Sequence, residues 1–223
     1  EVEAVLLNFR TNEMGWAQAS ELRKEIENLK AAKKGVFAWF SFADTRTYTV
    51  ISAADKSFVA PAGGVLLTGL EAQSMHIGDL LDRFGVKAEF VGTGPYKTAP
   101  ETFTRRGPSP AADQVQNALL DDLYAHVTAD IARGTGMTQA DVRKRIDEGT
   151  YTAKVAMKAG LVDGVMHYDE LERFFEGEFG RRFRFKSAKK QIDLRNERWG
   201  AIPKVAVLYV TGPITDGVSV DRK

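Results

Sequence analysis

Apolar residues recur along the first part of the chain with two spacings, which predict alternating strands and helices. Val5–Phe9 and Val36–Phe42 are nearly continuous apolar runs, typical of strands buried in a parallel sheet. Between them, Ala17–Lys30 carries apolar residues at helical spacing with charged residues between them, which predicts an amphipathic helix. Strand, helix and strand in this order predict a right-handed crossover with parallel strands.

Shorter elements separated by glycine and proline are expected next. They are a helix over Thr45–Ala54, strands over Lys56–Ala60 and Val65–Thr68, a helix over Ser74–Phe84 and a strand over Val86–Val91. Pro61–Gly64 predicts a turn between the two short strands. The repeated order of strand, strand and helix predicts an α/β domain in which helices and sheet share one core.

Residues 109–180 change character and predict a helical layer. A long amphipathic helix begins at the pair Ser109-Pro110 and runs to about residue 133. Further helices are expected to begin at Thr138 and to cover Thr152–Ala159 and Glu170–Phe179.

The remaining residues predict a boundary between domains. Basic side chains dominate residues 181–203, which we interpret as a solvated linker; contact with anionic lipid or with a neighbouring subunit is the alternative. Lys204–Val210 has the composition of a strong strand. We therefore expect one domain over residues 1–180 whose N-terminal part is missing, a basic linker over 181–203 and the first strand of a second, truncated domain over 204–223.

Composition excludes several classes of function. The chain has 31 basic and 30 acidic residues, so its total charge does not predict binding to nucleic acid. It has no cysteine, which excludes disulfides and thiolate metal sites. His76, His126 and His167 are far apart in the sequence and lack a suitably spaced partner, so we expect surface histidines, no metal and no cofactor.

Lys97 is the candidate catalytic residue. It precedes Thr98–Glu101, which has the residues of a helix start, with a threonine cap and a glutamate three residues later. The positive end of that helix and the apolar neighbours Phe90, Tyr96 and Phe103 would favour a neutral amine. A neutral lysine can act as a general base, whereas the alternative is a solvated surface lysine.

Four segments resemble signal peptide peptidase A, also called protease IV, in its long two-domain form. They are Gly94–Arg105, Ser109–Ala112, Thr152–Asp163 and Lys204–Gly217, and the resemblance covers most of Val5–Gly217. It implies a ClpP/crotonase-like fold, a ββα superhelical repeat followed by a helical layer. It also implies that Lys97 is the general base of a Ser/Lys dyad whose serine comes from the second domain.

The family's Ser-Gly-Gly-Tyr segment corresponds to Thr45-Arg-Thr-Tyr48 in this chain. Bulky residues replace both glycines, and they would block the close backbone approach that an oxyanion hole needs. The resemblance therefore implies a copy that keeps the base and lacks the nucleophile, so that the chain alone is inactive.

The resemblance implies a membrane-associated serine endopeptidase that degrades hydrophobic signal-peptide remnants. Its expected partners are the serine-bearing second domain and further copies in a homo-oligomer. It implies a location at the bacterial cytoplasmic membrane, with the catalytic part on the periplasmic or outer face and the anchor outside this chain. Two alternatives are a non-catalytic scaffold half of the oligomer and a crotonase-type acyl-CoA enzyme, for which Gly63-Gly64 is the only glycine doublet.

Overall fold

The computed structural model describes residues 2–10, 14–92, 94–180, 182 and 185–186. The chain divides into two units, Glu1–Arg181 and Arg182–Lys223. Most of the second unit, including the predicted strand Lys204–Val210 and most of the predicted linker, lies outside the described residues. The account below therefore concerns the first unit.

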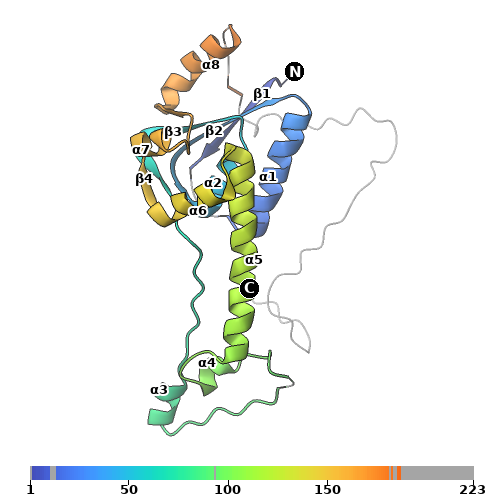
Figure 1. The fold of residues 1–223 in the computed structure, drawn as a ribbon, viewed down its shortest axis with the longest axis vertical. Coiled ribbons are helices and arrows are strands. Elements are labelled where there is room, and N and C mark those ends of the chain that lie inside the picture. Colours follow the sequence, from blue (N-terminus) through green and yellow to red (C-terminus); the bar gives the residue numbers. More distant parts are fainter. Residues whose placement is uncertain (1, 11–13, 93, 181, 183–184, 187–223) are drawn as a thin grey trace, which may run out of the picture. The chain divides into compact units, whose positions relative to one another are not determined.

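A mainly parallel sheet forms the centre of the first unit (Figure 1). Its strands are β1 (Ala4–Phe9), β2 (Gly35–Asp44), β3 (Lys56–Leu66), β4 (Thr150–Thr152) and β5 (Gly164–Val165). β1, β2, β3 and β5 pair in parallel, and β4 runs antiparallel to β3. Helix α1 (Trp16–Ala31) connects β1 to β2, so the predicted strand–helix–strand unit is confirmed.

β3 corrects the predicted turn at Pro61–Gly64, which instead lies inside one continuous strand. The register of β3 against β2 shifts between Phe40 and Phe42, so β3 bulges there. A Cβ atom on Gly63 would lie 1.9 Å from the carbonyl oxygen of Ser41. The glycine therefore permits close approach of two backbones and not a reversal of the chain.

The predicted helical layer is confirmed with small changes of bounds. Its helices are α5 (Pro110–Thr135), α6 (Gln139–Glu148), α7 (Ala153–Lys158), the 3₁₀ helix η1 (Tyr168–Glu170) and α8 (Leu171–Phe179). The hydroxyl of Ser109 accepts a hydrogen bond from the amide of Ala112 at the start of α5, and Thr138 caps α6 in the same way. With the sheet, these helices confirm the mixed α/β class.

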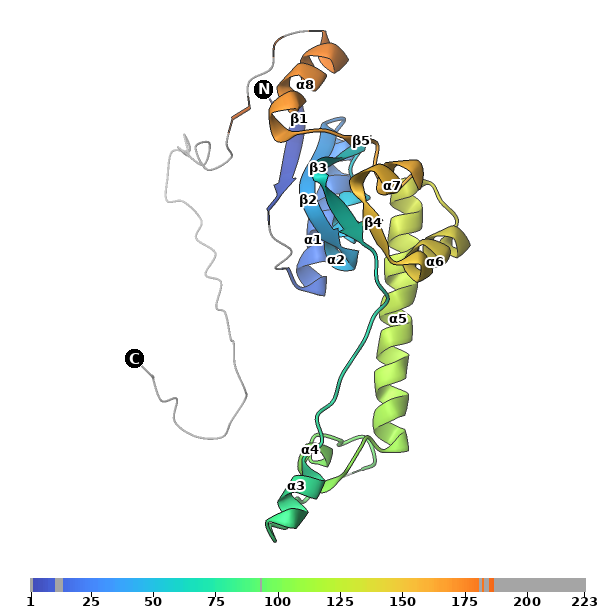
Figure 2. The same ribbon diagram turned by 90° about the vertical axis from the view of Figure 1, so that its left-hand side faces the viewer.

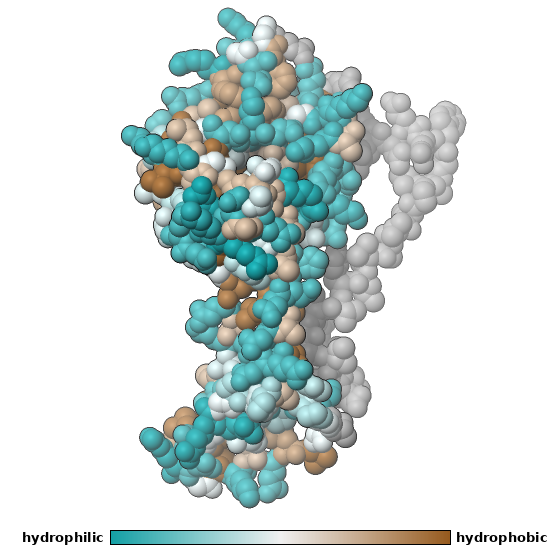
Figure 3. Space-filling model, viewed as in Figure 1, coloured by the Kyte–Doolittle hydropathy of each residue, from teal (hydrophilic) through white to brown (hydrophobic). Residues whose placement is uncertain are grey.

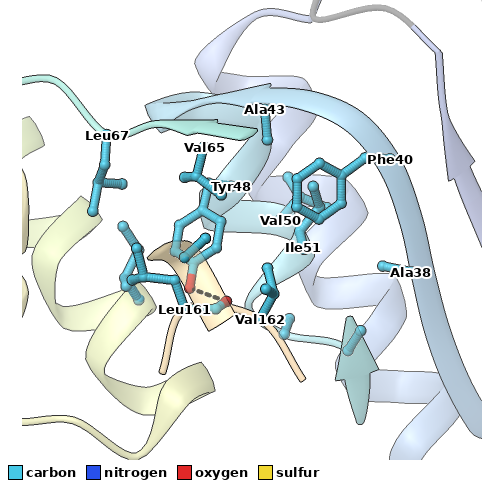
Figure 4. Packing of buried hydrophobic residues seen from close by; sticks show 14 of the residues in the cluster. Ala38, Phe40, Ala43, Tyr48, Val50, Ile51, Val65, Leu67, Leu161 and Val162 are labelled. Carbon is cyan, nitrogen blue, oxygen red and sulfur yellow. Dashed lines mark hydrogen bonds between the residues drawn. The ribbon is translucent and has the colours of Figure 1, made fainter. Parts of the chain in front are cut away.

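The core lies between β2, β3, α2 (Thr45–Ile51) and the C-terminal part of α5 (Figure 4). The buried guanidinium of Arg23, on α1, donates to the carbonyl oxygens of Thr49 and Asp130 and to the hydroxyl of Ser52. Burial lowers the pKa of Arg23, while the nearby carboxylate of Asp130 opposes this shift. One side chain thus joins α1 to the end of α2 and to α5.

Residues 69–109 leave the core and form an arm at the end of α5 farthest from the sheet (Figures 1 and 2). The arm contains α3 (Gly78–Arg83) and α4 (Glu101–Thr104). The predicted helix Ser74–Phe84 is therefore shorter than expected. The predicted strand Val86–Val91 is wrong, because these residues lie far from the edge of the sheet and have no strand to pair with among the described residues.

Candidate functional site

Lys97 lies in the arm, in a turn that precedes α4, and its side chain is exposed. Its amide donates to the carbonyl oxygen of Gly94, which has a left-handed φ of 84°. The predicted capping box at Thr98 is wrong, because α4 begins at Glu101 with Pro100 as its N-cap. The helix is one turn long, so it supplies little of the dipole that the sequence argument required.

The carboxylate of Glu101 binds another element instead. One oxygen accepts from the hydroxyl of Ser109 at 2.6 Å, and the other accepts from the amide of Ser109 at 2.8 Å. These hydrogen bonds are the main reason why the pKa of Glu101 is lowered. Because Ser109 caps α5, Glu101 fastens α4 to the start of the long helix.

The apolar residues that were expected to frame Lys97 are themselves exposed. The rings of Phe90 and Phe103 stack with centroids 5.8 Å apart, yet these residues are 52% and 42% exposed. Tyr96 is also exposed, and its hydroxyl donates to Gln114 in the first turns of α5. The expectation that this frame removes water from Lys97 is therefore wrong for the chain by itself.

The arm and the first half of α5 expose a group of apolar side chains that we call the arm surface (Figure 3). It consists of Met75, Leu80, Phe84, Val86, Phe90, Val91, Tyr96, Phe103, Val115 and Leu119. The apolar stripe of α5 explains part of it, because Val127 and Ile131 reach the core whereas Val115 and Leu119 lie beyond it. Large apolar side chains exposed in one part of a chain are typical of a site of interaction.

Thr45, which the resemblance aligned with the family's serine, is the first residue of α2. It is 5% exposed, and its hydroxyl donates to the carbonyl oxygen of Thr68 at 2.6 Å and accepts from the amide of Thr68 at 2.9 Å. The neighbouring Arg46 turns away, donating to the carbonyl oxygen of Met14 and lying over the ring of Trp16. These contacts support the prediction that Thr45 is not a nucleophile, because its hydroxyl is engaged by the backbone.

The structure keeps Thr45 and Lys97 apart. Tyr96 contacts α5 at Gln114, whereas Ser52, at the end of α2, packs against Gly134 of the same helix. These two points of α5 are separated by about 30 Å at a rise of 1.5 Å per residue. α2, which begins with Thr45, lies by the end of α5 nearest the sheet, whereas the turn that carries Lys97 belongs to the arm at the opposite end of α5 (Figure 1).

All three histidines were predicted to lie at the surface, but His76 is partly buried. Its Nε2 lies 3.1 Å from the hydroxyl of Ser74, and its Nδ1 lies 3.1 Å from the carbonyl oxygen of Glu101. Through these two contacts, His76 connects Ser74 to α4 and holds residues 74–76 against that helix. His126 is exposed, as predicted. Within the described ranges, no three His, Asp or Glu residues lie close enough together to bind a metal.

Neither a cavity in the core nor the glycine doublet adds to the site at Lys97. A cavity of about 100 Å³ is lined by Ser52, Asp55, Ser57 and Asp163 among others, and by no residue of the arm. Gly64 pairs with Thr152 of β4 within the sheet, and a Cβ atom on it would lie 2.4 Å from the carbonyl oxygen of Tyr151. The doublet that a crotonase-type oxyanion hole would need is packed inside the strand ladder.

Comparison with known proteins gives one family. A model described as "Peptidase family S49" matches residues 28–177. The chloroplastic serine protease SPPA of Arabidopsis thaliana is 25% identical over 170 residues, which are 76% of this chain and 25% of that protein. Protease 4 of Haemophilus influenzae is 24% identical over 210 residues, which are 87% of this chain and 34% of that protein. The chain thus spans about a quarter to a third of these relatives.

Solved structures with a similar arrangement were also found. A peptidase from Plasmodium falciparum matches with a TM-score of 0.46 and 10% identity, covering 74% of this chain and 79% of that one. The ClpP protease catalytic domain from Plasmodium falciparum matches with a TM-score of 0.46 and 9% identity, covering 75% of this chain and 70% of that one. The parallel sheet with its crossover helix is itself consistent with a ClpP/crotonase-like fold.

Proposed function

This chain belongs to peptidase family S49, and from that membership we propose that it is the base-supplying part of a serine peptidase with a Ser/Lys dyad. Lys97 is the general base, and the serine comes from a second domain joined through the linker over residues 181–203. The observation that carries the proposal is the position of Lys97 on an exposed turn of the arm, at the opposite end of α5 from Thr45. Because the hydroxyl of Ser109 in the arm is engaged by Glu101 and by the start of α5, we assign the nucleophile to another domain or chain.

Covering the arm surface prepares Lys97 for this reaction. A partner packed on Phe90, Tyr96 and Phe103 excludes water from the neighbouring amine, and loss of water disfavours the ammonium form. The apolar side chains that this chain leaves open are thus part of the environment of the base, completed on assembly.

The reaction then follows the general scheme of an activated hydroxyl. The neutral amine of Lys97 takes the proton of the serine hydroxyl while the serine oxygen bonds to the scissile carbonyl carbon. As the carbon–nitrogen bond breaks, the ammonium returns that proton to the departing amine. Lys97 next takes a proton from water as the water oxygen bonds to the acyl carbon. The bond between that carbon and the serine oxygen then breaks, Lys97 returns the proton to the serine oxygen, and the second product leaves as an acid.

We propose hydrophobic signal-peptide remnants as the substrate class, and a homo-oligomer as the assembly that covers the arm surface. We place this part of the protein on the periplasmic or outer face of the bacterial cytoplasmic membrane. In the part of the chain that the structure describes, no helix combines the length and apolar character needed to cross a bilayer.

The test replaces Lys97 in the full-length protein and measures cleavage of an extended apolar peptide. Lys97→Ala should lower kcat by about 10²–10⁴-fold, the contribution typical of a general base. Lys97→Arg should not restore activity, because a guanidinium stays charged. Lys87→Ala, which changes another exposed lysine of the arm, is the matched control and should keep parental activity. Parental kcat in Lys97→Ala would remove this residue from the mechanism.

A scaffold half without catalytic chemistry is the second candidate, favoured by the same arm surface. The two functions separate when the surface and the lysine are changed independently. Phe84→Asp should dissociate the oligomer, as measured by light scattering, whereas Val155→Asp, an equally polar change at an exposed position of α7, should not. Loss of assembly in Phe84→Asp together with full activity in Lys97→Ala would favour the scaffold.

A further inference from the structure

Thr68 is the residue at which the chain leaves the core for the arm. Before it, Leu67 is fully buried and its amide donates to the carbonyl oxygen of Gly149. At Thr68 itself, the hydroxyl of Thr45 binds both backbone groups, the amide at 2.9 Å and the carbonyl at 2.6 Å. One side chain therefore holds the last residue of the core on both of its polar sides.

Residues 69–77, which we call the strap, run from this point to the arm without regular secondary structure. At the far end, the amide of Ile77 donates to the carbonyl oxygen of Thr102, in α4, at 2.7 Å. Figure 2 shows the strap extended beside α5. From Thr68 to Ile77 a fully extended chain reaches about 30 Å, so the strap sets an upper limit on the distance between these two residues.

We propose that Thr45 is a positioning residue that holds the arm, and with it Lys97, by fastening the strap at Thr68. The arm has two connections to the core, α5 and the strap, and two connections fix its direction where one would let it swing. The claim about Lys97 rests on the proposed function, whereas the claim about the arm does not.

Breaking the hydrogen bonds to Thr68 should change the position of the arm relative to the core. Without the hydroxyl of Thr45, the next fixed point is Leu67, so the free strap gains one residue, or about 3 Å of reach. The arm can then tilt about α5. A displacement of this size at a catalytic group is large, since about 1 Å of misplacement can cost on the order of 10²-fold in rate.

The first experiment measures the arm directly by electron spin resonance between two spin labels. The 223-residue chain has no cysteine, so Asp82→Cys on α3 and Lys154→Cys on α7 give two unique attachment points on exposed residues. Thr45→Val should broaden the distance distribution and shift its mean by about 3 Å, and Thr45→Ser should restore it. An unchanged distribution in Thr45→Val would overturn the proposal.

A matched control separates positioning from a general loss of stability. Thr138→Val removes a hydroxyl that also makes two hydrogen bonds, with the amide and the carboxylate of Asp141 on α6, away from the strap. It should leave the distance distribution unchanged. Should Thr45→Val fail to fold, inserting two glycines after Gly69 tests whether the strap positions the arm. A longer strap should broaden the distribution of distances between the spin labels even though the hydroxyl of Thr45 is intact. Absence of that effect would also overturn the proposal.

Activity in the full-length protein tests the link to Lys97. Thr45→Val should lower kcat at least tenfold with little change in KM, and Thr45→Ser should recover the parental kcat. An altered distance distribution with parental kcat would refute the claim that this attachment places the base. Failure of the proposed function itself is recognised separately, by parental activity in Lys97→Ala, and leaves the distance measurement valid.

Discussion

The hydroxyl of Tyr48 donates a hydrogen bond of 2.6 Å to the carbonyl oxygen of Leu161, 113 positions further along the chain (Figure 4). Tyr48 is fully buried on α2, and Leu161 follows α7. Burial above all, and then the charge of Asp163, raises the pKa of Tyr48 well above its usual value. The phenol therefore stays neutral and joins α2, which lies between β2 and β3 in the chain, to the helical layer.

Removing this hydroxyl should destabilise the first unit. Tyr48→Phe leaves the buried carbonyl of Leu161 without its partner, which should lower the free energy of unfolding by about 1–3 kcal/mol. Urea unfolding followed by circular dichroism measures this change. Tyr96→Phe, which removes an exposed hydroxyl on the arm, should stay within about 0.5 kcal/mol of the parent. Equal stability of the two variants would contradict the assignment.

Two Gly→Ala changes should have opposite effects on stability. At Gly63 the new methyl group would meet the carbonyl oxygen of Ser41, so the bulge in β3 must open and the chain should be destabilised. At Gly177, inside α8, a Cβ atom meets nothing within 4 Å, so alanine should stabilise the helix by up to about 1 kcal/mol. Thermal unfolding distinguishes them, and a stabilised Gly63→Ala would show that the strand does not pass so close to β2.

The contact between Glu101 and Ser109 should make the arm sensitive to acid. Because hydrogen bonds from Ser109 lower the pKa of Glu101 in the folded chain, the carboxylate contributes stability above its ordinary pKa, and this contribution is lost as the pH falls through the lowered value. The difference in unfolding free energy between the parent and Glu101→Gln should therefore be present at neutral pH and shrink below about pH 4. A difference independent of pH would mean that the charge of Glu101 plays no part.

Much of the fold could be predicted from local sequence patterns. The apolar runs of β1 and β2 and the helical spacing of α1 each contain enough information to specify a buried strand or a one-sided helix. The caps Ser109 and Thr138 are equally local, because each satisfies an amide three residues away. The resemblance to signal peptide peptidase A was likewise recognised from short segments of the sequence. The match to peptidase family S49 confirmed the family.

Other features depend on residues that are distant in sequence. Val86–Val91 has the composition of a strand but no partner to pair with in the described part of the chain. Pro61–Gly64 has the composition of a turn but spans the bulge of β3, which pairs with β2 on both sides of it. Glu101 was expected to cap its own helix and instead binds Ser109.

The sequence by itself therefore determined the first strand–helix–strand unit, the helical layer, the mixed α/β class, the family and Lys97 as the candidate base. Tertiary structure alone decided that Lys97 stands exposed on an arm and that the hydroxyl of Thr45 holds Thr68. The physical reason is range: periodicity and caps act within a few residues, whereas exposure and the choice of hydrogen-bond partner depend on which distant segments the fold brings together.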